Sequence, residues 1–148
     1  MEYSRLELLM TIALAPVSPG LLTRELGHLH PSQILLDDGR YAVLTFRAEQ
    51  APRLMSEVVR LRQICLRQNG EGASEPERTS PSCTQLIAVD RSTGRVMGGY
   101  HMSLGERGRS VVVSSWQRSR RGLPLLQRGL RRWQGIREQG AALKLAAG

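Results

Sequence analysis

The chain has 148 residues, the length of one ordinary domain, and its hydrophobic share of 41% is sufficient for a core. Only one phenylalanine is present, so that core must be built from Leu, Val, Ile and Ala. No run of about 18 apolar residues occurs, which excludes a membrane-spanning helix. Cys65 and Cys83 have neither metal-site spacing nor a disulfide framework, so we expect reduced thiols in a cytoplasmic protein.

The formal net charge of +8 is concentrated in the last third of the chain. Residues 1–100 carry 11 Arg against 11 Asp or Glu, whereas residues 101–148 carry 10 Lys or Arg against 2 Glu. Such an excess favours an acidic partner, which could be nucleic acid, an anionic membrane surface or an acidic protein. Nearly all of the basic residues are arginine, which suits phosphate contacts. A coding bias towards arginine would give the same composition.

The N-terminal region is predicted to consist of helix and loop. Apolar spacing indicates an amphipathic helix over residues 4–14, since acidic residues at its start and prolines after it do not fit a signal peptide. A short helix or loop follows over residues 21–30. We therefore expect residues 1–39 to form an N-terminal extension, followed by a strand over residues 41–48 that is rich in β-forming residues.

A helix is predicted from Pro52 to about Gln68, because proline is well tolerated in a first helical turn. A polar loop over residues 69–82, rich in Gly, Pro and Ser, follows it. Apolar residues recur along the helix at steps of three and four, which predicts one buried face. That face comprises Leu54, Met55, Val58, Leu61, Ile64 and Cys65.

The second half of the chain is predicted to form a hairpin, a strand and a helix. The hairpin pairs residues 85–90 with residues 95–103 across the turn "RSTG", and a third strand covers residues 109–115. A helix over residues 124–138 turns its leucines and Trp133 inward and its arginines outward. This order of elements predicts an α/β (α+β) fold, with a mixed sheet flanked by helices.

Two adjacent glycines, Gly98 and Gly99, lie where the second hairpin strand should be strongest. Strand glycines lose packing and are favoured where the backbone bulges or is closely approached. One interpretation is a splayed strand whose backbone groups face a ligand. The alternative is a bulge that only twists the hairpin.

A cluster of arginines precedes the last helix. Arg118, Arg120 and Arg121 lead into Gly122, which should stand at the helix N-terminus. Free N–H groups and the helix dipole at such a position hold phosphate, and arginines add charge-assisted bonds. The alternative is a solvated basic loop.

Three ordered blocks resemble the hemolysin-like N-acyltransferases, which are the ornithine- and glycine-lipid synthases. The blocks are "MSEVVRLRQICLRQNGEG", "QLIAVDRSTGRVMGGY" and "GRSVVVSSWQRSRRGLPLLQRGL". This family is related to the GNAT-type acetyltransferases and the acyl-homoserine-lactone synthases, and the resemblance covers roughly residues 40–135. It implies that residues 40–148 form an acyltransferase-like domain that transfers a fatty acyl group from an acyl-carrier protein or coenzyme A thioester to the amino group of a small amino acid. No permanently bound cofactor and no metal are implied.

The resemblance assigns binding roles to residues in the first two blocks. Arg60 and Arg62 match the "LR" helix of the family. Gly98, Gly99 and Tyr100 match the "VGGYR" segment that ends the hairpin, where the fold would admit the thioester.

The third block carries the implied chemistry. Glu106, Gly108, Arg109 and Ser110 match four of the five positions of the family's "ELGRS". Glu106 would accept the proton of the attacking amine, and Arg109 would fix Glu106 or the substrate carboxylate. Backbone N–H groups near Val112 would polarise the thioester carbonyl. The alternative for Glu106 is an exposed turn carboxylate paired with an arginine.

The chain also departs from the family. Arg107 replaces an apolar residue, His101 replaces the Arg of "YR", and the match ends with the last helix, where relatives continue. We therefore expect a truncated or diverged member, and the resemblance leaves its catalytic competence open. Three kinds of non-catalytic basic binding protein are the alternatives: for an acyl-carrier protein, for the inner face of the membrane, or for nucleic acid. The last would use Trp116 and Trp133 to stack bases, but no nucleic-acid-binding motif is present.

Overall fold

The computed structural model describes residues 16–68, 83–104 and 110–147, and it has an α+β fold. The helix expected over residues 4–14 lies outside the described residues. The elements in chain order are α2 (Pro19–His28), the short 3-10 helix η1 (Pro31–Gln33), β1 (Ile34–Asp37), β2 (Tyr41–Phe46), α3 (Pro52–Gln68), β3 (Cys83–Asp90), β4 (Arg95–Leu104), β5 (Ser110–Gln117) and α4 (Gly122–Ala147).

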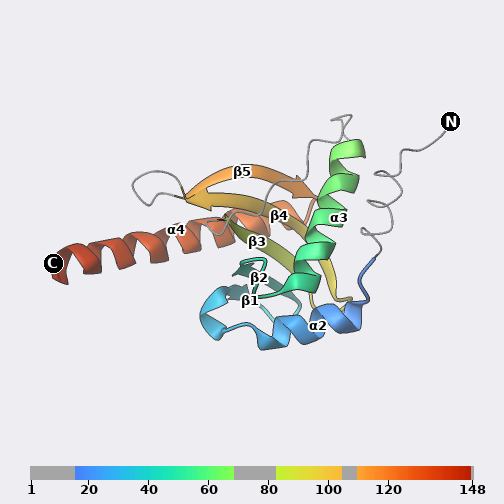
Figure 1. Cartoon of the computed structure of the whole chain (residues 1–148), viewed down its shortest axis with the longest axis horizontal. Helices are drawn as coiled ribbons and strands as arrows, with labels where there is room; N and C mark the ends of the chain where they lie inside the picture. Colours follow the sequence, from blue (N-terminus) through green and yellow to red (C-terminus); the bar gives the residue numbers. More distant parts are fainter. Residues whose placement is uncertain (1–15, 69–82, 105–109, 148) are drawn as a thin grey trace.

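The strands form one sheet in the order β1-β2-β3-β4-β5, and each neighbouring pair is antiparallel (Figure 1). The predicted hairpin is confirmed, since β3 and β4 pair from Cys83↔Ser103 to Asp90↔Arg95. The predicted strand and helix that follow are also confirmed, as β5 and α4. β1 was not predicted from its four residues, which are too few to show a period.

Helices cover both faces of the sheet (Figure 1). On one face, α2 and α3 enclose a core cluster that contains Phe46, Leu54 and Trp116. On the other face, α4 encloses a second cluster that contains Val43, Leu126 and Trp133. These two clusters show that alternate residues of the central strands point to opposite cores, as the period of two requires.

The apolar face predicted for α3 is largely confirmed. Leu54, Val58, Leu61 and Cys65 are buried against the sheet. Ile64, however, is 38% exposed, so its predicted burial is wrong. Helix geometry explains the difference, because successive residues rotate by about 100° and Ile64 falls at the margin of the buried stripe.

Residues of the predicted N-terminal extension contribute to the same sheet. β1 pairs with β2, and Leu22 and Leu29 of the α2 region join the core cluster beside α3. Ser18 caps α2 by accepting the N–H of Leu21 at 3.4 Å, and Pro19 occupies the first turn. The sequence was compatible with either a helix or a loop over residues 21–30, and capping together with packing selects the helix.

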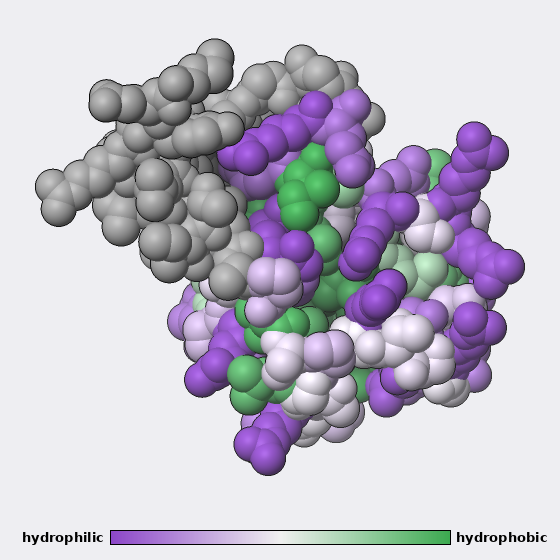
Figure 2. Space-filling model, turned by 90° about the vertical axis from the view of Figure 1, so that its right-hand side faces the viewer, coloured by the Kyte–Doolittle hydropathy of each residue, from purple (hydrophilic) through white to green (hydrophobic). Residues whose placement is uncertain are grey.

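α4 is longer than predicted and continues past the edge of the sheet (Figure 1). Its first half packs on the sheet through Leu126 and Trp133, and Gly129 lies directly over Val43. No helix in the described part of the chain has the length and apolarity that crossing a membrane would need. Seen from the α3 side, hydrophilic side chains surround small apolar patches (Figure 2).

Candidate functional site

The glycine pair of β4 has a packing role. A Cβ atom on Gly98 would lie 2.9 Å from the Trp116 carbonyl oxygen, on the face that Leu126 of α4 covers. A Cβ atom on Gly99 would lie 3.2 Å from the Trp116 ring, on the α3 face. Both distances are shorter than ordinary van der Waals contact. Only glycine lets the neighbouring strand and α4 approach this closely.

The interpretation of these glycines as a splayed strand is wrong. β3 and β5 pair with the two edges of β4 at Gly98 and Gly99, so β4 is closed there on both sides. The alternative bulge is present beside them, where the β3–β4 register shifts between Ala88 and Val89. Tyr100, predicted to bind the thioester, is buried in the α4-side core, and burial raises the pKa of its hydroxyl.

The sequence analysis placed a distorted strand at the glycine pair of β4, whereas in the structure β5 carries a distortion of this kind. Among the described strands β5 pairs only with β4, which makes it an edge strand. Its register shifts between His101↔Ser114 and Met102↔Val112, so Val113 is an extra residue. Such bulges occur preferentially at sheet edges and beside active sites. Val112, predicted to lie near the thioester carbonyl, is 37% exposed at this bulge.

A basic groove opens where β2 begins, the β3–β4 turn closes and β5 leads into α4. Its volume is about 410 Å³, within the range of small-molecule sites. We call it the arginine groove. It is lined by Arg40, Tyr41, Asp90, Thr93, Arg95, Val96, Met97, Arg118, Ser119 and Arg121.

Several interactions tie the arginines of this groove together. Arg121 donates through Nη1 to the Tyr41 hydroxyl at 3.4 Å, and the Arg40 guanidinium lies 5.0 Å from the centroid of the same ring. Arg40 also approaches the Asp90 carboxylate at 3.9 Å. A hydrogen bond from the Ser92 hydroxyl, with a smaller contribution from Arg40, lowers the pKa of Asp90. Asp90 therefore remains ionised at neutral pH.

The groove as a whole favours an anion. Its lining holds four arginines and one carboxylate, so positive charge predominates there. The N-terminus of α4 begins directly after Arg121, and its first turn contains no acidic residue that would occupy the positive end of the dipole. Gly122 fits here because its Cα packs on the Met97 backbone, where a Cβ would lie 3.3 Å from the carbonyl oxygen.

The structure separates the predicted arginine cluster. Arg118 and Arg121 line the groove, whereas Arg120 is exposed and is not among the lining residues. Arg60 lies on α3 and pairs with Glu57, whose carboxylate also accepts the Val17 N–H at 2.9 Å. This buried pair anchors α3 to the chain before α2, which is a structural role.

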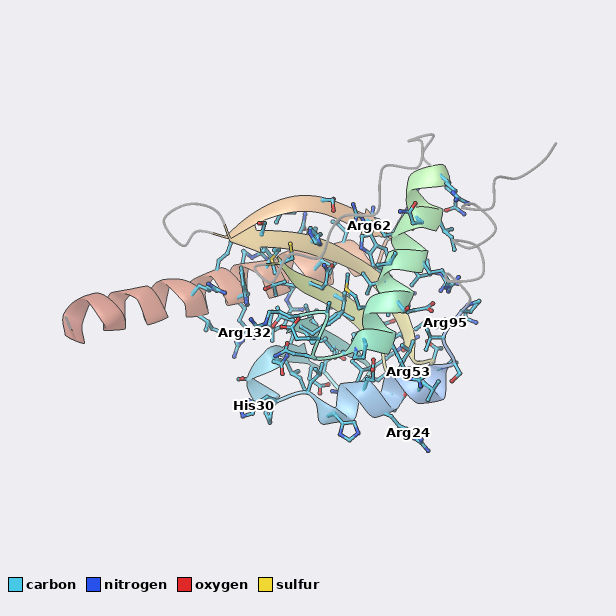
Figure 3. All side chains as sticks on the ribbon, in the orientation of Figure 1. Arg24, His30, Arg53, Arg62, Arg95 and Arg132 are labelled. Carbon is cyan, nitrogen blue, oxygen red and sulfur yellow. The ribbon has the colours of Figure 1, made fainter. Side chains whose placement is uncertain are left out.

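Arg62 and Arg95 lie in different places. Figure 3 shows Arg95 at the end of the sheet beside α2, and Arg62 on α3. Arg62 lines a small cavity together with Gln63, Gln85 and His101. The "LR" helix therefore does not contribute to the arginine groove.

The pair Gln85 and His101 is a candidate that sequence reasoning missed. Both side chains are almost completely buried, and the Gln85 amide nitrogen lies 2.5 Å from His101 Nδ1. A polar residue at a core-facing position in each of two apolar strands was the available signal. Its meaning depends on the register that brings the two side chains together.

The remaining predicted residues cannot be placed. Glu106, Gly108 and Arg109 lie outside the described residues, and only the backbone of Ser110 is described, at the start of β5. Within the described part of the chain, no three His, Cys, Asp or Glu side chains are grouped as a metal site would require. The chain matches no protein-family model, no curated protein and no solved structure.

Proposed function

We propose that the chain binds the phosphate-bearing arm of an acyl-carrier protein or coenzyme A thioester in the arginine groove, and transfers the fatty acyl group to the amino group of a small amino acid. The observation that carries this proposal is that four arginines, Arg40, Arg95, Arg118 and Arg121, line one groove, and that α4 begins directly after the last of them. Guanidinium groups and a helix N-terminus are both effective phosphate ligands.

The edge strand supports the same proposal. Arg118 directly follows β5 and lies five residue steps after Val113, which is about 17 Å at the usual rise of a strand. An extended phosphopantetheine arm can span that length along the edge of β5 that pairs with no other described strand. The thioester would then reach the bulge at Val113, where backbone N–H groups can polarise its carbonyl.

A base-stacking nucleic-acid site receives less support. Trp116 and Trp133 are 5% and 8% exposed, each within a core cluster, so neither offers a ring to a base. The positive charge alone would also attract an anionic membrane surface. An acidic carrier protein matches both the positive charge and the phosphate-binding groups of the groove, because it carries negative charge and a phosphate-bearing arm.

Calorimetric titration with coenzyme A and with an acyl-carrier protein bearing its phosphopantetheine tests the binding step. The double variant Arg118→Ala/Arg121→Ala should weaken binding at least tenfold, since a hydrogen bond to a charged group contributes about 1.5–3 kcal/mol. It should also reduce the salt dependence. The double variant Arg120→Ala/Arg131→Ala is the matched control, because it removes the same two positive charges from exposed positions outside the groove. Equal losses of affinity in both variants would show that the ligand is attracted by the overall positive charge and not by the groove.

Acyl transfer is tested separately with a radiolabelled long-chain acyl-carrier protein and a panel of amino acids. The expected product is an N-acyl amino acid whose formation is lost in the double variant. Binding without product would leave a non-catalytic carrier-binding protein. Tight binding of DNA together with no binding of either carrier would refute the proposal.

A further inference from the structure

A second pocket, which we call the α2 pocket, lies between α2 and the sheet. Its volume of about 270 Å³ is close to the lower end of the range of small-molecule sites. Its wall is mostly aliphatic and is formed by Leu26 of α2, Ile34 of β1, Ala42 and Leu44 of β2, and Val89 of β3. Such a wall favours a ligand with an apolar body, because contact with these side chains removes apolar surface from water.

The turn between β3 and β4 separates the α2 pocket from the arginine groove. Arg91 and Gly94 of this turn line the α2 pocket, whereas Thr93 of the same turn and its flanking residues Asp90 and Arg95 line the groove. The two sites share the turn but no lining residue. A ligand in the α2 pocket would therefore bind separately from the phosphate proposed for the groove.

Two glycines shape the α2 pocket. Gly94 has a φ of +68°, and a Cβ atom on it would lie 3.0 Å from Pro19 Cβ, so glycine lets the turn pack against the start of α2. Gly27 lines the pocket two turns further along α2, and a Cβ atom there would meet no heavy atom within 4 Å. The helix thus touches the turn near its first residue and leaves space beside Gly27.

Arg91 supplies the polar contact at the rim of the α2 pocket. It is the one charged residue among the described lining residues, and its side chain is 44% exposed. Its Nη2 lies 2.7 Å from the Asp37 carboxylate, but an ion pair this exposed is weak and uses only part of the five guanidinium N–H donors. The Thr23 hydroxyl already donates to the Pro19 carbonyl at 2.9 Å. An acceptor, preferably anionic, is therefore the head group that suits this rim.

The size of the α2 pocket limits the length of its ligand. A cavity of about 150 Å³ holds benzene, with its six carbons, so about 270 Å³ has room for roughly eleven heavy atoms. No aromatic residue lines the described pocket, so an aromatic ring would find no ring to stack on. An aliphatic chain of eight carbons that ends in a carboxylate has ten heavy atoms and fits these limits.

We propose that the α2 pocket binds a medium-chain aliphatic carboxylate of about eight carbons. The chain lies against the aliphatic wall, and the carboxylate accepts hydrogen bonds from Arg91 at the rim. This inference goes beyond the proposed acyl transfer and does not rest on it, because it concerns a different pocket and a ligand that undergoes no reaction.

The first test locates octanoate on the wild-type chain by NMR. Backbone amide signals are recorded while octanoate is added below the concentration at which it forms micelles. The signals of Gly27 and Gly94 should shift, since both residues line the α2 pocket. Gly122 packs on Met97 of the arginine groove and reports on that site. Shifts at Gly122 without shifts at Gly27 and Gly94 would place the carboxylate in the groove and refute the inference.

The second test compares ligands by calorimetric titration. Octanoate should bind about tenfold more tightly than hexanoate, because two more methylene groups are buried. Dodecanoate should gain nothing further, since its fourteen heavy atoms exceed the roughly eleven that the pocket can hold. Octanol should bind about tenfold more weakly than octanoate, because it lacks the charge-assisted hydrogen bonds to Arg91. An affinity that keeps rising by equal steps through dodecanoate would indicate an open apolar surface and refute the pocket.

The third test fills the pocket. Gly27→Leu should weaken octanoate binding at least tenfold, because the leucine side chain occupies the space that the ligand needs. Gly20→Leu is the matched control: it makes the same change in the same helix, also with no heavy atom within 4 Å of the added Cβ, but outside the pocket lining. Both variants should keep or raise Tm, because leucine favours a helix over glycine. Wild-type affinity in Gly27→Leu, or an equal loss in both variants, would contradict the proposed site.

The fourth test removes the rim charge. Arg91→Gln should abolish the preference for octanoate over octanol while leaving the affinity for octanol within twofold. Arg24→Gln removes an equal charge from α2, where Figure 3 shows Arg24 pointing away from the sheet, and it should leave the preference unchanged. Thermal unfolding checks the fold of both variants. A preference for octanoate that survives in Arg91→Gln would exclude Arg91 as the carboxylate ligand and overturn the proposal.

Discussion

The contact between α4 and the sheet can be tested at a single atom. Gly129 lies over Val43 of β2, and a Cβ atom added there would lie 2.4 Å from Val43 Cγ1. Ordinary carbon–carbon contacts are about 3.5–4.0 Å, so Gly129→Ala forces an overlap of more than about 1 Å. Val43 is fully buried and its branched side chain has few rotamers, so α4 must move away from the sheet.

The expected magnitude is the difference between two effects. Overpacking a core contact costs about 1–3 kcal/mol, whereas replacing glycine by alanine inside a helix gains about 0.8–1.0 kcal/mol. Gly129→Ala should therefore lower the free energy of unfolding by up to about 2 kcal/mol. Gly135→Ala in the same helix meets no atom within 4 Å, so it should raise the free energy of unfolding by the helical gain of about 1 kcal/mol.

Urea and thermal unfolding, followed by circular dichroism, measure both variants against the wild type. A separation of about 1–3 kcal/mol between them corresponds to several degrees in Tm. In a Val43→Ala background, which removes the obstructing methyl groups, Gly129→Ala should lose most of its cost. Equal stabilisation by both alanines in the wild-type background would refute the close approach of α4 to β2.

Two further predictions concern charged groups. Glu57→Ala leaves Arg60 without its partner in a largely buried site and removes the acceptor of the Val17 N–H. It should therefore lower the free energy of unfolding, measured in urea titrations, by about 3 kcal/mol. A loss below about 1 kcal/mol would contradict this structural role. Hydrogen bonding to Ser92 lowers the pKa of Asp90 in the folded state. This carboxylate therefore stabilises the fold at pH values above its unfolded pKa of about 3.9. The stabilisation is lost as the pH falls through the lower pKa of the folded state. Asp90→Asn should therefore flatten the decrease of Tm between pH 4 and 2, and an unchanged slope would exclude Asp90 as a contributor.

The local sequence pattern was sufficient to predict most of the helices and strands. The steps of three and four residues after Pro52 predicted α3 and most of its buried face, because a helix turns its side chains with a fixed period. The apolar runs on either side of "RSTG" predicted the β3–β4 hairpin for a similar reason. β1 was missed because four residues contain too few repeats to show a period.

The candidate sites depended on tertiary structure. Arg40 and Arg121 are 81 positions apart, and they meet because the start of β2 and the start of α4 lie at the same end of an antiparallel sheet. Gln85 and His101 come into contact only through the hairpin register, since a shift of one residue would turn one of them to the opposite face. The sequence by itself determined most of the segments that are helix and strand, with β1 missed and α2 left open, and it determined where the positive charge lies. Which arginines share a groove, and which polar residues share a core, was decided by the pairing of distant strands, because no local period encodes those contacts.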